Sequence, residues 1–226
     1  DEFIYHEMLA HVPLFAHGAA KAVLIVGGGD GGLAEEVLKH ESVEAVTLVE
    51  IDQGVVDFAE AHFRAMSEAA FADPRLEVTI ADGLAFAAET ERRFDVILVD
   101  STDPIGPGEV LFRESFYRDL ERILNPGGVV ATQNGVPFLQ PREFQMGLGN
   151  LRRVFADATA YVIAVPTYFG GHMTLGFAGE PRPDPTLETL RERFAAARFE
   201  TRYYTPEVHR AAFALPAFID RLLAAA

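Results

Sequence analysis

The chain has 226 residues, of which 19 are Lys or Arg and 34 are Asp or Glu, so its formal net charge is −15. This acidic balance argues against nucleic acid and anionic membrane surfaces as partners, because both attract basic proteins, and it favours a cationic small molecule. The 49% of hydrophobic residues exclude a disordered chain. The absence of Cys excludes disulfides, thiolate nucleophiles and Cys-based zinc sites.

Neither a membrane span nor a secretion signal is predicted from the sequence. No apolar run approaches the ~20 residues of a membrane span, and no secretion signal follows Asp1. The missing initiator Met leaves room for a longer protein. We therefore expect a cytoplasmic protein with one globular domain over residues 1–226.

Short apolar runs alternate with helical segments along the first part of the chain. Buried strands are predicted at 22–26, 45–49, 76–80, 94–99 and 129–132. The helices between them are predicted at 33–38, 54–66, 84–89 and 116–124. The stretch Asn125–Gly128 ends the last of these helices in the way helices usually end. Apolar strands separated by helices predict a parallel sheet that is covered on both faces.

The pattern changes beyond residue 155. The predicted strands there are at 160–165 and 173–177, and the predicted helices are at 187–197 and 213–226. The loop Pro166–His172 joins the two strands as an antiparallel pair at the edge of the sheet, and Pro181–Pro185 is a linker. We therefore predict an α/β fold: a doubly wound, Rossmann-like sheet of the methyltransferase type, mostly parallel, with an antiparallel C-terminal edge.

Acidic residues follow the predicted strands. In a doubly wound sheet the ligand lies outside the carboxyl ends of the strands, so the residues directly after each strand form one rim. Four consecutive strand ends each bring at least one carboxylate to it, from Asp30, Glu50, Asp52, Asp82, Asp100 and Asp103. This clustering favours a binding site. The alternative is that these acids cap helices or lie solvated in loops.

The loop after the first strand, Gly27–Gly32, reads GGGDGG and contains the G-x-G-x-x-G pattern. Glu50 follows about 20 residues further on, where an acid binds ribose hydroxyls. A nicotinamide dehydrogenase would carry the same pattern, but Asp30 argues against it, because a pyrophosphate needs backbone N–H groups rather than another anion. A nucleoside with a sulfonium and an amine fits better, with Glu50 on its ribose and Asp82 on its adenine amino group.

Asp100 and Asp103 are two carboxylates in one loop, which Pro104, Gly106, Pro107 and Gly108 restrain. We interpret them as a general base and a cation anchor. The alternative is a turn whose Asp side chains bond their own backbone. The neighbouring Asp30 favours the chemical interpretation.

Several of these segments together resemble the polyamine aminopropyltransferases, in particular the bacterial spermidine synthases. The matching segments are GGGDGG at 27–32, VEID at 49–52, DG at 82–83 and DSTDPIGP at 100–107. Residues 1–13 are similar to the family's entry helix, and the resemblance covers essentially the whole chain. It implies a step of polyamine biosynthesis: transfer of an aminopropyl group from decarboxylated S-adenosylmethionine to putrescine, which yields spermidine and methylthioadenosine.

The resemblance also implies roles for single residues. Asp100 matches the proton acceptor. The residues that match the amine-binding channel are Tyr5, His6, Asp30, Asp103 and Tyr168. Those that match the nucleoside site are Gly27, Gly29, Glu50, Asp82, Gly83, Ser101 and Pro107. The segment 103–111 matches a gate over the site.

The family further implies a homodimer or homotetramer that uses no metal. His6, His11 and His17 do not share a helix face, which also argues against a metal site. We expect the family's small N-terminal β domain to be absent here, and Glu35 and Ala72 depart from the family's usual residues. Two alternatives stay open: a methyltransferase that uses S-adenosylmethionine to modify an amine, and a non-catalytic fragment that binds polyamine or nucleoside. The acceptor stays open among putrescine, cadaverine, agmatine and spermidine.

Overall fold

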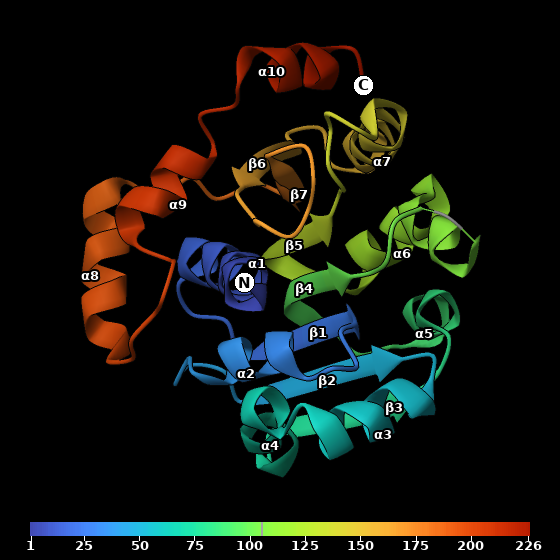
Figure 1. Cartoon of the computed structure of the whole chain (residues 1–226), viewed down its shortest axis with the longest axis vertical. Helices are drawn as coiled ribbons and strands as arrows, with labels where there is room; N and C mark the ends of the chain where they lie inside the picture. The colour runs from blue at the N-terminus through green and yellow to red at the C-terminus, as the bar shows by residue number, and fades with distance from the viewer. Residues whose placement is uncertain (105) are drawn as a thin grey trace.

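The structure is a computed structural model that describes residues 1–104 and 106–226, without the side chain of Pro107 (Figure 1). Within these residues a seven-stranded sheet has the order β3-β2-β1-β4-β5-β7-β6. Its strands are β1 Ala22–Gly27, β2 Ala45–Glu50, β3 Leu76–Ile80, β4 Phe94–Asp100, β5 Leu124–Gln133, β6 Thr159–Ile163 and β7 Met173–Gly179.

The first five strands are parallel, and the last two form the antiparallel edge. The first strand of the chain, β1, lies in the interior of the sheet. β2 and β3 follow outward on one side of it, and β4 then lies on its other side. The strand order therefore reverses between β1 and β4, where Gly27 lies opposite Asp100. The predicted fold class is confirmed, and the reversal creates the crevice at which such sheets bind ligands.

Helices cover both faces of the sheet. They are α1 Glu2–His17, α2 Gly32–Leu38, α3 Gln53–His62, α4 Arg64–Ala72, α5 Gly83–Glu89, α6 Glu114–Ile123, α7 Pro141–Val154, α8 Leu187–Ala197, α9 Pro206–Ala212 and α10 Ala217–Ala224, with the 3₁₀ helix η1 at Gly106–Phe112. Of the helices described, none combines the length and the apolar composition that a membrane crossing needs.

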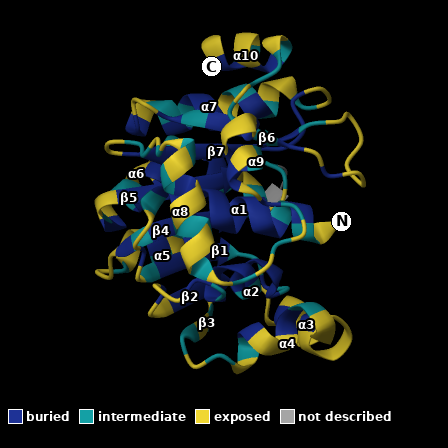
Figure 2. Ribbon diagram, turned by 90° about the vertical axis from the view of Figure 1, so that its left-hand side faces the viewer, coloured by how far each residue is buried: buried dark blue, intermediate teal, exposed yellow. Residues whose placement is uncertain are grey.

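Side chains alternate along the strands between two hydrophobic cores. In β1, Val23 and Ile25 join the core under α1, α2 and α8, while Leu24 and Val26 join the core under α6, α7 and α10. This is why the strand is apolar at successive positions, since both of its faces are buried. Figure 2 shows α1 mostly in the colour of buried residues, in the interior of the molecule.

The predicted helix at 54–66 is wrong, because two helices occupy this region. α3 ends at His62 and α4 begins at Arg64, with Phe63 between them at φ −116° and ψ 30°, outside the helical region. The hydroxyl of Ser67 donates to the carbonyls of Ala59 and Phe63 at 3.5 and 3.2 Å, which stabilises the bend. Apolar spacing alone does not reveal such a side-chain contact.

The stretch Asn125–Gly128 does not form the predicted loop after a helix. α6 ends at Ile123, β5 begins at Leu124, and the four residues are an irregularity inside β5, where the register with β4 shifts. Gly127 has φ +79° there, a conformation that favours glycine. The helices α7 and α9 were not predicted, and α10 occupies only part of the helical segment expected at the C-terminus.

Candidate active site

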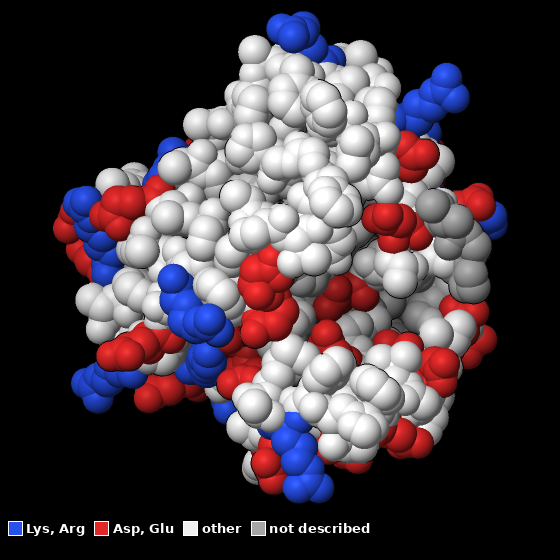
Figure 3. Space-filling view, viewed as in Figure 1, with Lys and Arg blue, Asp and Glu red and all other residues white. Residues whose placement is uncertain are grey.

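The carboxylates of the rim lie close together at the reversal point. The backbone N–H of Gly29, in the loop after β1, donates to Glu50 Oε2 at 3.2 Å, and Glu50 stands at the end of β2. The negative charges of Asp30 and Glu50 both act on Asp100, at the end of β4. Figure 3 shows acidic side chains gathered around a hollow in the middle of this face, with Lys and Arg mainly toward its edges.

The glycine loop needs glycine for this close approach. A Cβ on Gly27, which has φ +86°, would lie 2.0 Å from the carbonyl oxygen of Asp100. A Cβ on Gly29 would lie 2.7 Å from Cγ of Glu50. Both predicted glycines thus keep β1, β2 and β4 close enough for their terminal carboxylates to share one space.

Asp100 is the most strongly perturbed carboxylate of this cluster. Its pKa is raised to about 6, mainly by burial and to a smaller extent by the charges of Asp30 and Glu50, whereas His6 and a hydrogen bond from Tyr5 lower it. The hydroxyl of Tyr5 donates to Asp100 Oδ1 at 2.7 Å. A carboxylate with this pKa is ionised at neutral pH and still basic enough to accept a proton.

Helix α1 brings Tyr5 and His6 to the carboxylates. His6 is buried, with Nε2 3.8 Å from Asp30 Oδ2. A Cβ on Gly32 would lie 2.4 Å from the His6 ring, so glycine is needed there for the ring to fit. The predicted amine-binding residues of α1 and of the glycine loop are therefore neighbours in space.

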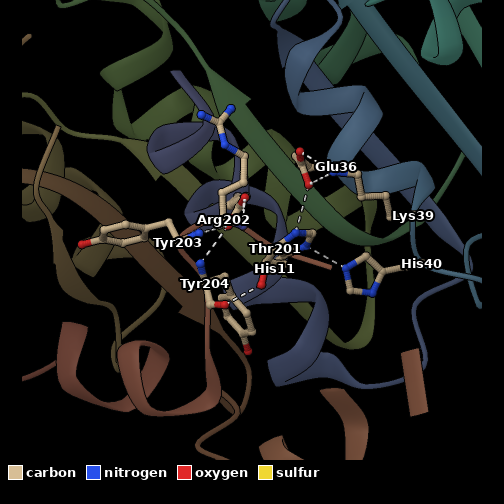
Figure 4. Close-up of polar contacts among 9 residues, drawn as sticks. His11, Glu36, Lys39, His40, Thr201, Arg202, Tyr203 and Tyr204 are labelled. Carbon is tan, nitrogen blue, oxygen red and sulfur yellow. Dashed lines mark hydrogen bonds and ion pairs between the residues drawn. The ribbon is translucent and has the colours of Figure 1, made fainter. Parts of the chain in front are cut away.

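The other side of α1 is fixed by buried polar groups (Figure 4). The carboxylate of Glu7 accepts the backbone N–H groups of Arg202, Tyr203 and Tyr204 at 2.7, 2.8 and 2.7 Å. His11 lies between two groups of the α2 region, with Nδ1 3.0 Å from His40 Nε2 and Nε2 3.1 Å from Glu36 Oε2. These contacts set the position of α1 and thus of the residues it presents to the site.

The helix-capping interpretation is correct for part of the rim. Asp52 and Asp82 are the N-caps of α3 and α5 and accept from the N–H groups of Gly54 and Leu84, each at 2.8 Å. Asp30 does not cap α2, whose N-cap is Gly31, but it accepts from the N–H of Gly32 at 3.0 Å. Each of these bonds uses one carboxylate oxygen, Oδ1. These local hydrogen bonds are therefore compatible with ligand binding by the same residues.

Two glutamines that were not predicted hold Asp103. Gln133 donates through Nε2 to Asp103 Oδ1 at 3.0 Å, and Gln140 donates through Nε2 to Oδ2 at 2.7 Å. Gln133 is the last residue of β5. The polar residues at the ends of the first four strands were considered as site residues, and the same consideration at the end of the fifth strand would have found Gln133. Gln140 directly precedes α7, a helix that apolar spacing did not reveal.

The remaining predicted residues lie around this centre. The hydroxyl of Ser101 is buried and has no hydrogen-bond partner among the described residues. Gly83 packs against Val26, from whose Cγ1 an added Cβ would be 2.5 Å away. Tyr168 is 52% exposed in the loop between β6 and β7, and its hydroxyl is among the groups that raise the pKa of Tyr5, after burial and Asp100. The side chain of Pro107 and Ile105 of the predicted gate lie outside the described residues.

The sheet and the site together define a doubly wound α/β protein with an anionic crevice at the point where the strand order reverses. The model of the spermine/spermidine synthase domain matches residues 2–185. The polyamine aminopropyltransferase of Ruegeria sp. (strain TM1040) is 56% identical over 98% of this chain and 79% of that protein. Polyamine aminopropyltransferase 1 of Pseudomonas aeruginosa PAO1 is 55% identical over 97% of this chain and 77% of that protein.

Solved structures agree with these relatives. A spermidine synthase in complex with the transition-state analogue AdoDATO has a TM-score of 0.94 and 40% identity, over 100% of this chain and 77% of that one. The spermidine synthase of Thermotoga maritima has a TM-score of 0.90 and 38% identity, over 99% of this chain and 75% of that one. The chain belongs to the spermine/spermidine synthase family and is an enzyme of the aminopropyltransferase class. This assignment favours the predicted aminopropyl transfer over the methyltransferase alternative.

Proposed function

We propose that this chain transfers an aminopropyl group from decarboxylated S-adenosylmethionine to putrescine, with residues 1–226 acting as one Rossmann-like catalytic domain. The observation that carries the proposal is the position of Asp100. It is a carboxylate of raised pKa that lies beside Tyr5 and within the field of Asp30 and Glu50. This arrangement suits a cationic substrate that must lose one proton. The homo-oligomer and the cytoplasmic location stay predictions.

The acceptor amine needs such a base. A primary amine has a pKa of roughly 10.4, so populating its free base at pH 7 costs about 4–5 kcal/mol. The nitrogen lone pair attacks the carbon bonded to the sulfonium, the new C–N bond forms as the C–S bond breaks, and the sulfur keeps the electron pair. Asp100 accepts the proton that the amine loses. The leaving group is a neutral thioether and needs no acid, so catalysis consists mainly of positioning and one proton acceptor.

The other predicted residues divide between the two substrates. Asp103, Asp30 and His6 hold the amines of putrescine and of the aminopropyl group, with Tyr5 and Tyr168 along the channel. Glu50 accepts from the ribose hydroxyls, since its two bonds to the N–H groups of Gly29 and Asp52 leave lone pairs on both oxygens.

The remaining nucleoside contacts come from the loops around the adenine. Asp82 binds the adenine amino group with its second oxygen. Gly27, Gly29 and Gly83 let the backbone approach, while Ser101 and Pro107 complete the pocket. Asp30 also disfavours ordinary S-adenosylmethionine, because the carboxylate of that molecule would be repelled.

Mass spectrometry of the reaction products tests the proposal. The protein is incubated with decarboxylated S-adenosylmethionine and, separately, putrescine, cadaverine, agmatine and spermidine. We expect putrescine to gain one aminopropyl unit and methylthioadenosine to appear in equal amount. A product formed from S-adenosylmethionine instead, or no product with any amine, would contradict the proposed function.

Replacing the base tests its role separately. Asp100→Asn keeps the shape of the side chain but cannot accept the proton, so we expect kcat to fall by about 10²–10⁴-fold. The affinity for methylthioadenosine, measured by calorimetry, should change by less than about threefold, because the product carries no reacting amine. Asp220→Asn, at an exposed residue of α10, is the matched control. An Asp100→Asn enzyme of normal kcat would show that another group accepts the proton.

A further inference from the structure

The amide of Gln140 is held in one orientation. Its Oε1 accepts the backbone N–H of Val136 at 3.0 Å, and its Nε2 donates to Asp103 Oδ2 at 2.7 Å. Because the oxygen of the amide already has a donor, the NH₂ group must face Asp103. The side chain forms no capping bond to α7, although Gln140 occupies the N-cap position of that helix.

Gly135 leaves the space that this amide occupies. It has φ +69°, and a Cβ there would lie 2.7 Å from Gln140 Oε1 and 3.8 Å from Asp103 Oδ1. Any side chain at this position would therefore push the amide away from the carboxylate. The turn after β5 thus allows the side chain of Gln140 to contact Asp103, which lies 37 residues earlier in the sequence.

Both oxygens of Asp103 receive a neutral donor. Gln133 bonds Oδ1 and Gln140 bonds Oδ2, and among the described residues no Lys or Arg forms an ion pair with this carboxylate. Amides stabilise the ionised form of a carboxylate without cancelling its charge. The full negative charge of Asp103 thus stays available to a cation.

We propose that Gln140 is a positioning residue that aims the charged Asp103 carboxylate at the ammonium group of the acceptor amine. The inference rests on the proposed function, in which Asp103 binds that amine. Gln140 itself contacts the carboxylate and acts through it. It therefore determines how tightly the amine binds, and it leaves proton transfer to Asp100 and nucleoside binding unchanged.

Gln140→Glu tests this, because it keeps the acceptor for Val136 and replaces the donor toward Asp103 by a carboxylate. Near pH 8 we expect the KM for putrescine to rise at least tenfold, while kcat at saturating amine and the affinity for methylthioadenosine change less than about threefold. Toward pH 6 the ratio of the variant KM to the wild-type KM should shrink, because the introduced carboxyl group binds a proton and can donate to Asp103 as the amide does.

Two further variants make the result specific. Gln140→Met removes both polar atoms, so it should raise the KM for putrescine by a factor that does not depend on pH. Gln145→Glu adds the same charge to α7 at a side chain that instead donates to the carbonyl of Leu222 at 3.3 Å, and it should leave the KM unchanged. Methylthioadenosine binding by calorimetry shows for each variant that the nucleoside site is folded.

Asp103→Asn, measured in parallel, separates the inference from the proposed function. If it raises the KM for putrescine at least tenfold and the Gln140 variants do not, the role of Gln140 is wrong and that of Asp103 stands. If Asp103→Asn leaves the KM for putrescine unchanged, Asp103 does not bind the amine. The proposed roles of Asp103 and of Gln140 are then both wrong. A Gln140→Glu defect that is independent of pH, or that extends equally to methylthioadenosine, would show a general loss of structure and overturn the inference.

Discussion

At the scale of single residues, the pKa of Asp100 is a balance of opposing contributions. Burial is the largest contribution and raises it, and the charges of Asp30 and Glu50 raise it as well. The Tyr5 hydroxyl and His6 oppose this by stabilising the ionised form. With a net pKa of about 6, the Asp100 carboxyl group is therefore ionised at neutral pH but lies close to its titration range.

Tyr5→Phe should shift this balance. The variant loses the 2.7 Å hydrogen bond that stabilises the ionised carboxylate, so the pKa of Asp100 rises. A bond of about 1 kcal/mol corresponds to a shift of roughly half a unit to one unit. Since Asp100 must be ionised to accept a proton, the acid limb of kcat/KM for putrescine should move to higher pH.

The control for this measurement is Tyr117→Phe. The hydroxyl of Tyr117 is buried without a hydrogen-bond partner among the described residues, so its removal should leave the acid limb in place. An unchanged limb in Tyr5→Phe would mean that Tyr5 does not bond Asp100 in the working enzyme.

At the scale of elements, α1 is held by ionisable groups in the interior. His11 and His40 lie between α1 and α2 beside Glu36, with Lys39 bonded to Glu36 at 2.7 Å. Burial lowers the pKa of His11, although Glu36 opposes the shift, and burial lowers the pKa of His40 well below its usual value. Both rings are therefore neutral in the folded protein at pH 7.

These shifts predict how stability depends on pH. Between the lowered pKa of the folded state and about 6.5, the unfolded chain binds more protons than the folded one, so the free energy of unfolding falls as the pH drops below about 6.5. Asp100, whose pKa is raised to about 6, acts in the opposite direction. His40→Gln removes one histidine and keeps a donor for His11, so its free energy of unfolding should fall less between pH 7.5 and 5.5.

Urea denaturation at the two pH values measures this difference. His62→Gln, at an exposed residue of α3, is the control and should retain the wild-type dependence on pH. If His40→Gln also retained it, His40 would not be neutral in the folded protein.

At the scale of the whole molecule, the net charge of −15 and the acidic hollow act together. A crevice lined by one sign of charge concentrates ions of the opposite sign and accelerates their association. Putrescine is a dication at neutral pH, whereas methylthioadenosine carries no charge on its sulfur. Salt should therefore affect the two ligands differently.

We expect kcat/KM for putrescine to fall several-fold as NaCl rises from about 20 to about 300 mM, because the shorter screening length weakens attraction over the crevice. The affinity for methylthioadenosine should change less than about twofold over the same range. Steady-state kinetics and calorimetry provide the two values. Equal salt effects on both ligands would mean that the charge of the crevice does not steer the amine.

The strands, the glycine loop and the carboxylate rim could be predicted from the sequence because each depends on local rules. Apolar runs at 22–26 and 94–99 are typical of buried parallel strands, and the residues after such strands must meet at one edge of the sheet. Asp30, Glu50 and Asp100 therefore came together as predicted. The bend at Phe63 and the irregular start of β5 did not follow from these rules, since side-chain bonds and strand register decide them.

The sequence by itself thus determined the fold class and the family. Only the tertiary structure decided which groups surround each acid. Gln140 meets Asp103 across 37 residues, and the carboxylate of Glu7 meets the backbone of Arg202 across 195. Such contacts depend on how the elements pack against one another, which no local pattern encodes. The pKa of Asp100 belongs with them, because burial is a property of the packed chain.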